Sequence, residues 1–142
     1  MDVGELELIE RIRARIGAPG RATLVGIGDD AAVLEQDKRL LLFTSDAFVE
    51  GVHFRREYSS FRQIGAKSMT ANVSDIAAMG GFPTAATVCV CLPPDLSASD
   101  VDELYAGMLE VGSPHGVEIV GGDVVSAGVT FARNEGIISA PE

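Results

Sequence analysis

Hydrophobic residues recur along the chain at the spacings typical of helices and strands. An apolar stripe at helical spacing runs through Leu6, Ile9, Ile12 and Ile16 and ends before Gly17 and Pro19, which predicts an amphipathic N-terminal helix. A second helix is predicted over residues 60–79, where two glycines and a proline follow. A third is predicted over residues 99–111, with Ser99 and Asp102 spaced like a capping box.

Shorter apolar runs predict strands between these helices. They cover residues 23–25, 32–34, 40–45, 84–92, 117–120 and 129–132. Because helices alternate with strands, the predicted fold class is α/β or α+β, with a mixed β-sheet flanked by helices. No linker or repeat divides the chain, so we expect one domain over residues 1–132. The last residues, 133–142, show no clear element and are expected to form a disordered tail.

Composition and charge narrow the classes of partner. The chain has 142 residues, 46% hydrophobic content and a formal net charge of -10. Such a charge argues against nucleic acid or an anionic membrane as the main partner, because phosphates would be repelled. The negative charge does not exclude a phosphate ligand that binds together with a divalent metal ion, because the metal makes the local charge positive. Without a signal peptide or an apolar run long enough for a membrane span, we expect a cytoplasmic protein.

Aspartate interrupts the apolar pattern in four places. GIGDDAAVL places Asp30 after two glycines, LLLFTSD ends a predicted strand at Asp46, and EIVGGDVV ends another at Asp123. In the second helix, Ser68, Asn72 and Asp75 share one polar face. Carboxylate and hydroxyl oxygens are the ligands that Mg²⁺ prefers, and Mg²⁺ is usually completed by substrate phosphates. The set therefore predicts a phosphoryl-transfer site, although the chain has no P-loop motif.

Each aspartate also has a simpler interpretation when it is taken alone. An aspartate at a strand end is commonly a turn residue or a helix cap, and the glycines before Asp123 are commonly a tight turn. Asp75 could bond a neighbouring backbone amide, and His53 could be a half-buried residue of an irregular segment. The coincidence of four sites, and no single one of them, favours the metal hypothesis.

The motifs together resemble a known family. GIGDDAAVL, TSDAFVEGVHF, GAKSMTANVSDIAAMGGFPTAA and VEIVGGD occur in the order and at the spacings of the N-terminal domain of thiamine-monophosphate kinase, over residues 4–123. The resemblance implies the aminoimidazole ribonucleotide synthetase-like fold, with the sheet pairing across a homodimer. It also implies transfer of the γ-phosphoryl group of ATP to thiamine monophosphate, giving thiamine diphosphate and ADP with several Mg²⁺ ions.

The resemblance also implies roles for particular residues. His53 would lie near thiamine monophosphate, and Asp29 would have a cap or metal-water role. Gly122 and Asp123 would border the nucleotide phosphates, and Tyr105 would contact ATP. The implied metal ligands are Asp30, Thr44, Ser45, Asp46, Asp75 and Asp123.

The chain departs from the family in two respects, which keep alternatives open. Asp123 is followed by Val124, Val125 and Ser126 in place of the family's threonines and basic residue. Family members are also longer and have a C-terminal domain, which we expect to be absent here, so that the chain is half of an enzyme. The alternatives are a catalytically incomplete module for metal binding and dimerisation, or another ATP-dependent member of the superfamily, such as aminoimidazole ribonucleotide synthetase, selenophosphate synthetase or a hydrogenase-maturation enzyme.

Overall fold

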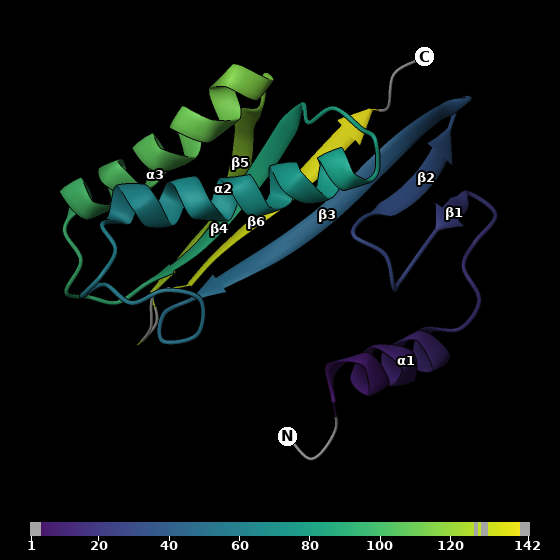
Figure 1. Cartoon of the computed structure of the whole chain (residues 1–142), viewed down its shortest axis with the longest axis horizontal. Coiled ribbons are helices and arrows are strands. Elements are labelled where there is room, and N and C mark those ends of the chain that lie inside the picture. Colours follow the sequence, from purple (N-terminus) through teal and green to yellow (C-terminus); the bar gives the residue numbers. More distant parts are fainter. Residues whose placement is uncertain (1–3, 127, 129–130, 140–142) are drawn as a thin grey trace.

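One six-stranded mixed sheet forms the framework of the protein (Figure 1). The computed structural model describes residues 4–126, 128 and 131–139, the last range by its backbone alone. The strand order across the sheet is β1-β2-β3-β6-β4-β5. The strands are β1 (Thr23–Val25), β2 (Ala32–Gln36), β3 (Arg39–Val49), β4 (Ala85–Leu92), β5 (Glu118–Ser126) and β6 (Phe131–Ser139). The helices are α1 (Glu5–Ile16), α2 (Phe61–Ala78) and α3 (Ala98–Gly112), followed by the 3₁₀ turn η1 (Ser113–His115).

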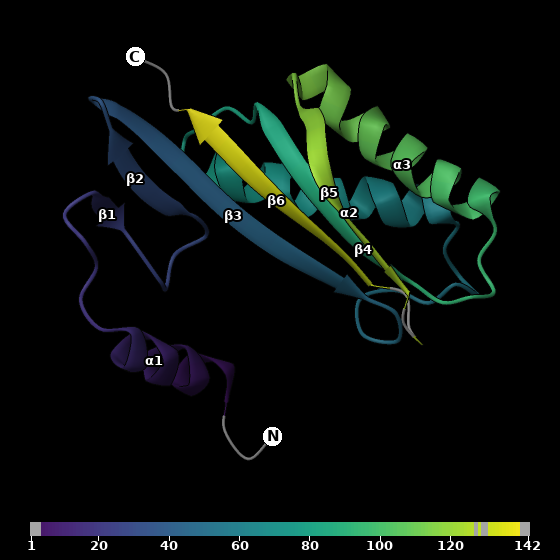
Figure 2. The same cartoon turned by 180° about the vertical axis from the view of Figure 1, so that it is seen from behind.

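Two crossover connections explain why α2 and α3 lie on the same face of the sheet. Strands β3 and β4 both pair antiparallel with β6, so they run in the same direction, and β4 and β5 pair in parallel. The chain therefore crosses from β3 through α2 to β4 and then through α3 to β5, always moving the same way across the sheet. Right-handed crossovers put both helices on one face. Figure 2 shows the opposite face of the sheet with no described helix over it.

The core lies between this helical layer and the central strands. Val88 and Val90 of β4 pack against Met69 of α2 and against Leu104 and Met108 of α3. A smaller cluster joins residues of β2 and β3 to the C-terminal half of α2; its buried members are Ala31, Val33, Leu42 and Ile76. Both ends of α2 are therefore anchored, which fixes the position of its polar residues relative to β3.

The N-terminal helix is confirmed, but its apolar stripe is not buried. Helix α1 contains no buried residue, and Leu6 and Ile16 are 80% and 68% exposed. It lies apart from α2 and α3, on the side of the sheet where β1 is found (Figure 1). Amphipathic spacing predicted the helix correctly, because spacing depends on local geometry, whereas it could not specify what the stripe contacts.

Several boundaries differ from the sequence-based prediction. The capping box of α3 is formed by Ser97 and Asp100, two residues before the predicted pair Ser99 and Asp102. Strand β3 continues past Ser45 to Val49, and β5 continues through the glycines to Ser126. The continuation is possible because a partner strand supplies backbone hydrogen bonds even where the side-chain pattern is polar.

The predicted tail is the largest correction. Residues 133–139, expected to be disordered, belong to β6, which lies between β3 and β4 and pairs with β3 over nine residues. Residues 129 and 130 of the predicted strand, and residues 140–142 of the predicted tail, lie outside the described residues. This strand was not predicted because its polar and charged residues, RNEG, weaken the alternation of apolar and polar positions that marks a half-buried strand.

Within the described residues, no helix is long and apolar enough to cross a membrane. Cys89 and Cys91 are free thiols, half-buried on β4.

Candidate functional site

The strand β3 divides its polar residues between the two faces of the sheet. Leu42, Thr44 and Phe48 are buried and alternate with the exposed Ser45 and Ala47. Side chains of a strand alternate between faces, so Thr44 and Asp46 point to the face that α2 covers and Ser45 points to the other. The three consecutive residues predicted as metal ligands are therefore not on one side of the sheet.

Thr44 connects three of the predicted motifs. Its side chain is 8% exposed, and its Oγ1 lies 2.7 Å from Oδ2 of Asp75 and 3.1 Å from the backbone carbonyl oxygen of Asp30. A hydroxyl has one proton, so Thr44 donates to one of these acceptors at a time, and the shorter contact is the one to the carboxylate. The GIGDD turn, the strand and the helix therefore meet at this hydroxyl.

Asp46 is a half-buried acidic group with a raised pKa. Burial raises its pKa above the usual value, the carboxylate of Asp75 raises it further by repulsion, and His53 lowers it. The carboxylates of Asp46 and Asp75 therefore repel each other across the contact between β3 and α2. A cation beside them would relieve both the burial cost and the repulsion.

In the GIGDD turn, the two aspartates have different surroundings. Oδ1 of Asp29 accepts a hydrogen bond from the backbone N–H of Asp30 at 2.9 Å, so Asp29 acts as a cap within the turn. The Asp30 side chain is exposed, while its carbonyl faces Thr44. Gly28 has a φ of 114°, a conformation that L side chains rarely adopt. The turn thus needs glycine before the acidic pair.

Asp123 lies away from this group. It is on β5, in register with Cys89, and its Oδ1 accepts from the backbone N–H of Val124 at 2.9 Å. Three strand spacings, on the order of 14 Å, separate β5 from β3. Gly122 has a structural reason of its own, because a Cβ there would lie 1.8 Å from the carbonyl oxygen of Val88. The structure therefore does not bring Asp123 together with Asp46 and Asp75.

His53 and Tyr105 lie on different elements of the fold. His53 is exposed in the turn that follows β3, and in its protonated form it lowers the pKa of Asp46. Tyr105 is on α3 and packs half-buried against the main core cluster. Burial raises the pKa of the Tyr105 hydroxyl, with a smaller contribution from Cys89.

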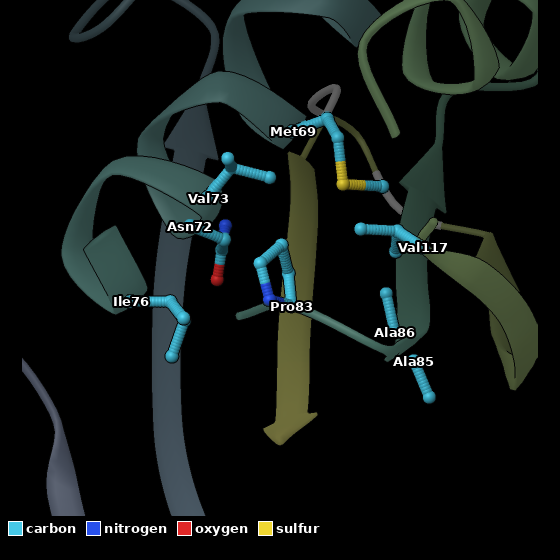
Figure 3. Close-up of a pocket in the computed structure, with 8 residues that line it drawn as sticks. All are labelled: Met69, Asn72, Val73, Ile76, Pro83, Ala85, Ala86 and Val117. Carbon is cyan, nitrogen blue, oxygen red and sulfur yellow. The ribbon is translucent and has the colours of Figure 1, made fainter. Parts of the chain in front are cut away.

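The polar face of α2 is more deeply buried than its pattern suggested. Ser68 and Asn72 are buried, and Ser68 donates to the carbonyl of Gly65 at 2.9 Å. Asn72 donates to the carbonyl of Ser68 at 3.1 Å, but its Oδ1 is buried with no hydrogen-bond partner among the described residues. This oxygen points into an apolar pocket of about 10 Å³ (Figure 3). The residues lining the pocket are Met69, Asn72, Val73, Ile76, Pro83, Ala85, Ala86 and Val117.

The donor set fits a hard cation whose coordination is completed by a ligand. In the part of the chain that the structure describes, no three His, Cys, Asp or Glu side chains are grouped so as to hold a metal ion. Asp46 and Asp75 supply two carboxylates, and the Thr44 hydroxyl lies beside them. Mg²⁺ is commonly held by one or two carboxylates plus waters and substrate phosphates, so this oxygen-only set suits Mg²⁺ better than it suits a closed metal cage.

Comparison with known proteins agrees with this architecture. A family model described as "AIR synthase related protein, N-terminal domain" matches residues 28–138. The chain belongs to this family. The match begins at Gly28 and includes all of β2 through β5, and therefore the contact between Thr44 and Asp75.

The similar proteins are longer than this chain. Thiamine-monophosphate kinase of Bacillus subtilis is 41% identical over 103 residues, which are 72% of this chain and 32% of that protein. The enzyme of the same name from Aquifex aeolicus is 37% identical over 87% of this chain and 38% of its own length. A solved structure described as "AaThiL complexed with AMPPCP and TMP" superimposes with a TM-score of 0.88 at 32% identity, covering 97% of this chain and 42% of that one. The chain thus spans about a third of the curated relatives.

Proposed function

We propose that this chain is the N-terminal, ATP- and Mg²⁺-binding part of a thiamine-phosphate kinase, and that this part includes β6. The reaction is transfer of the γ-phosphoryl group of ATP to thiamine monophosphate. The contact that joins Thr44 and Asp75, with Asp46 beside it, carries the proposal. Relatives named for this activity, and a neighbour whose description includes AMPPCP and TMP, support the choice of substrates.

The chemistry follows from the charges of the two substrates. The acceptor oxygen belongs to a phosphate that is already anionic, so it needs no strong general base. The main barrier is repulsion between the acceptor phosphate and ATP, and bound Mg²⁺ supplies the positive charge that offsets it. Asp46 and Asp75 would hold the cation, and the Thr44 hydroxyl would orient the Asp75 carboxylate.

The remaining predicted residues would contact the cation or the substrates from outside the pair Asp46 and Asp75. Asp30 would add its exposed carboxylate from the turn that Thr44 contacts. Gly122, Asp123 and Tyr105 would serve the nucleotide, and His53 would serve thiamine monophosphate. Ser45 points to the uncovered face, so it could reach only a cation bound on that side.

Asp75→Asn tests the metal site in this chain. We expect Mg²⁺ to raise the melting temperature of the parent chain and to raise that of Asp75→Asn much less, because the amide keeps its shape but loses its charge. Asp102→Asn on the exposed side of α3 is the matched control and should respond to Mg²⁺ like the parent. An equal response of Asp75→Asn and the parent would contradict the metal assignment.

Turnover is tested separately. ADP release is measured with ATP, Mg²⁺ and thiamine monophosphate, and Asp75→Asn should remove most of it in any form of the protein that is active. If this chain binds Mg²⁺ but releases no ADP, the second candidate is favoured: a catalytically incomplete module for metal binding and dimerisation.

The observation that favours the module is the sheet face that no described helix covers (Figure 2). Val120, Val124 and Val125 on the edge strand β5 are exposed. Pairing with a second copy would cover such an edge. Because β5 is an exposed edge strand, we propose that the chain forms a homodimer, which sedimentation would measure. A cytoplasmic location remains a prediction.

A further inference from the structure

The turn between β3 and α2 holds the ring of His53 in one orientation. Val49 and His53 exchange two hydrogen bonds. The backbone N–H of Val49 donates to Nδ1 of His53 at 3.0 Å, and the backbone N–H of His53 donates to the carbonyl of Val49 at 2.9 Å. The N–H of Gly51, which has a φ of 81°, donates to the carbonyl of Phe54 at 2.8 Å. Backbone and ring are thus closed into one unit over residues 49–54.

This arrangement sets where the ring carries its proton. A nitrogen that accepts a hydrogen bond from a backbone N–H has no proton of its own, so the neutral ring of His53 is protonated on Nε2. The side chain is exposed, and among the described residues no hydrogen-bond partner contacts Nε2. The neutral ring therefore presents an N–H donor to solvent.

Lys67 ties the His53 segment of the turn to the helical layer. Its Nζ donates to the carbonyl of His53 at 3.0 Å and lies 5.7 Å from the centroid of the Phe48 ring. The Phe48 ring is buried in the core and lies 5.5 Å from the His53 ring. The ion pair of Arg56 with Glu50 joins two residues of the turn itself. Lys67 is thus the side chain that joins the His53 backbone to α2.

We propose that Lys67 is a positioning residue, which holds the turn so that neutral His53 offers its Nε2–H to an acceptor oxygen of the phosphorylated substrate. The substrate part of this inference rests on the proposed function; the positioning part does not. Lys67 is not among the site residues predicted from the sequence, since a single lysine on a helix is usually a solvated residue. The sequence signal that could have indicated Lys67 is the rarity of lysine, because the chain contains only one other, Lys38.

The first experiment observes the ring itself in the intact chain. Long-range ¹H–¹⁵N spectra report which ring nitrogen is protonated, and the only other histidine is His115. We expect one neutral tautomer, protonated on Nε2, in the parent and in Lys67→Arg. In Lys67→Met, we expect a mixture of tautomers and amide exchange at Val49 about tenfold faster, as loss of one charge-assisted hydrogen bond would give.

Lys38→Met is the matched control, because it removes the same charge from an exposed turn. It should leave both signals of the parent unchanged. If Lys67→Met keeps the parent tautomer and the parent exchange rate at Val49, the positioning role is overturned, whatever the function of the chain.

The second experiment measures binding of thiamine monophosphate in the presence of Mg²⁺. Lys67→Met should weaken binding about tenfold and Lys67→Arg should recover most of it, as expected when a charge-assisted hydrogen bond is lost and replaced. If the parent does not bind thiamine monophosphate, the proposed function fails while the spectra still decide the role of Lys67. If the spectra change as expected and binding does not, the link from His53 to the substrate is overturned.

Discussion

The close contact between α2 and α3 leads to a prediction that can be worked out from distances. A Cβ added at Gly65 would lie 1.9 Å from the carbonyl oxygen of Leu104, and one added at Gly107 would lie 1.9 Å from the carbonyl oxygen of Arg62. Real Cβ contacts do not fall below 3.0 Å, so the helices would have to separate by more than 1 Å at this point. The obstacle is backbone on both sides and cannot rotate away.

Gly65→Ala should therefore destabilise the protein, although alanine is the better helix former. Overpacking of a rigid contact costs about 3 kcal/mol, and the gain in helix propensity returns about 1 kcal/mol, which leaves a net loss of about 2 kcal/mol. For a domain of this size the loss corresponds to a fall in melting temperature of about 7 °C. Urea denaturation and thermal unfolding both measure it.

Two further variants make this prediction specific. Gly20→Ala meets open space, so its free energy of unfolding should stay within about 0.5 kcal/mol of the parent. The double variant Gly65→Ala with Gly107→Ala should lose less than the sum of the single losses, because the first substitution already separates the helices. A Gly65→Ala protein as stable as the parent, or more stable, would refute the reasoning.

Three other predictions concern polar groups on β3 and α2. Thr44→Val keeps the shape of the side chain but removes the donor to Asp75, so urea denaturation should show a loss of about 1–2 kcal/mol; no loss would mean that water replaces the hydroxyl fully. Asp46→Asn should stabilise the Mg²⁺-free chain at pH 7. Because folding raises the pKa of Asp46, its ionisation lowers the stability of the fold at pH values above the folded-state pKa. The advantage of Asn should therefore vanish as the pH falls below 3.8, where Asp46 is protonated in both states. An advantage that persists in acid would contradict this. Asn72→Leu fills an apolar pocket and removes the unpartnered Oδ1, so its melting temperature should equal or exceed that of the parent, whereas Asn72→Asp should lower it sharply by burying a charge.

Much of the local structure could be predicted from the sequence because it depends on short-range geometry. Helix α2 was expected over residues 60–79 and is observed as Phe61–Ala78, where a capping box of Ser60 and Gln63 begins it. Strand β4 was expected to begin at Thr84 and begins at Ala85. Where a prediction failed, as for β6, the strand is stabilised by pairing with partners far away in the sequence.

For the candidate site, the sequence by itself determined which residue types are available, and only the tertiary structure decided which of them meet. The four aspartate motifs are visible in the printed letters, and two of them converge with Thr44 because α2 crosses the sheet over β3. Ser45 faces the other side because strand side chains alternate, and Asp123 is separated from β3 because β6 and β4 lie between them. Spacing along a chain encodes a helix face or a strand face, but the distance between two elements depends on the order of strands in the sheet, which no local pattern contains.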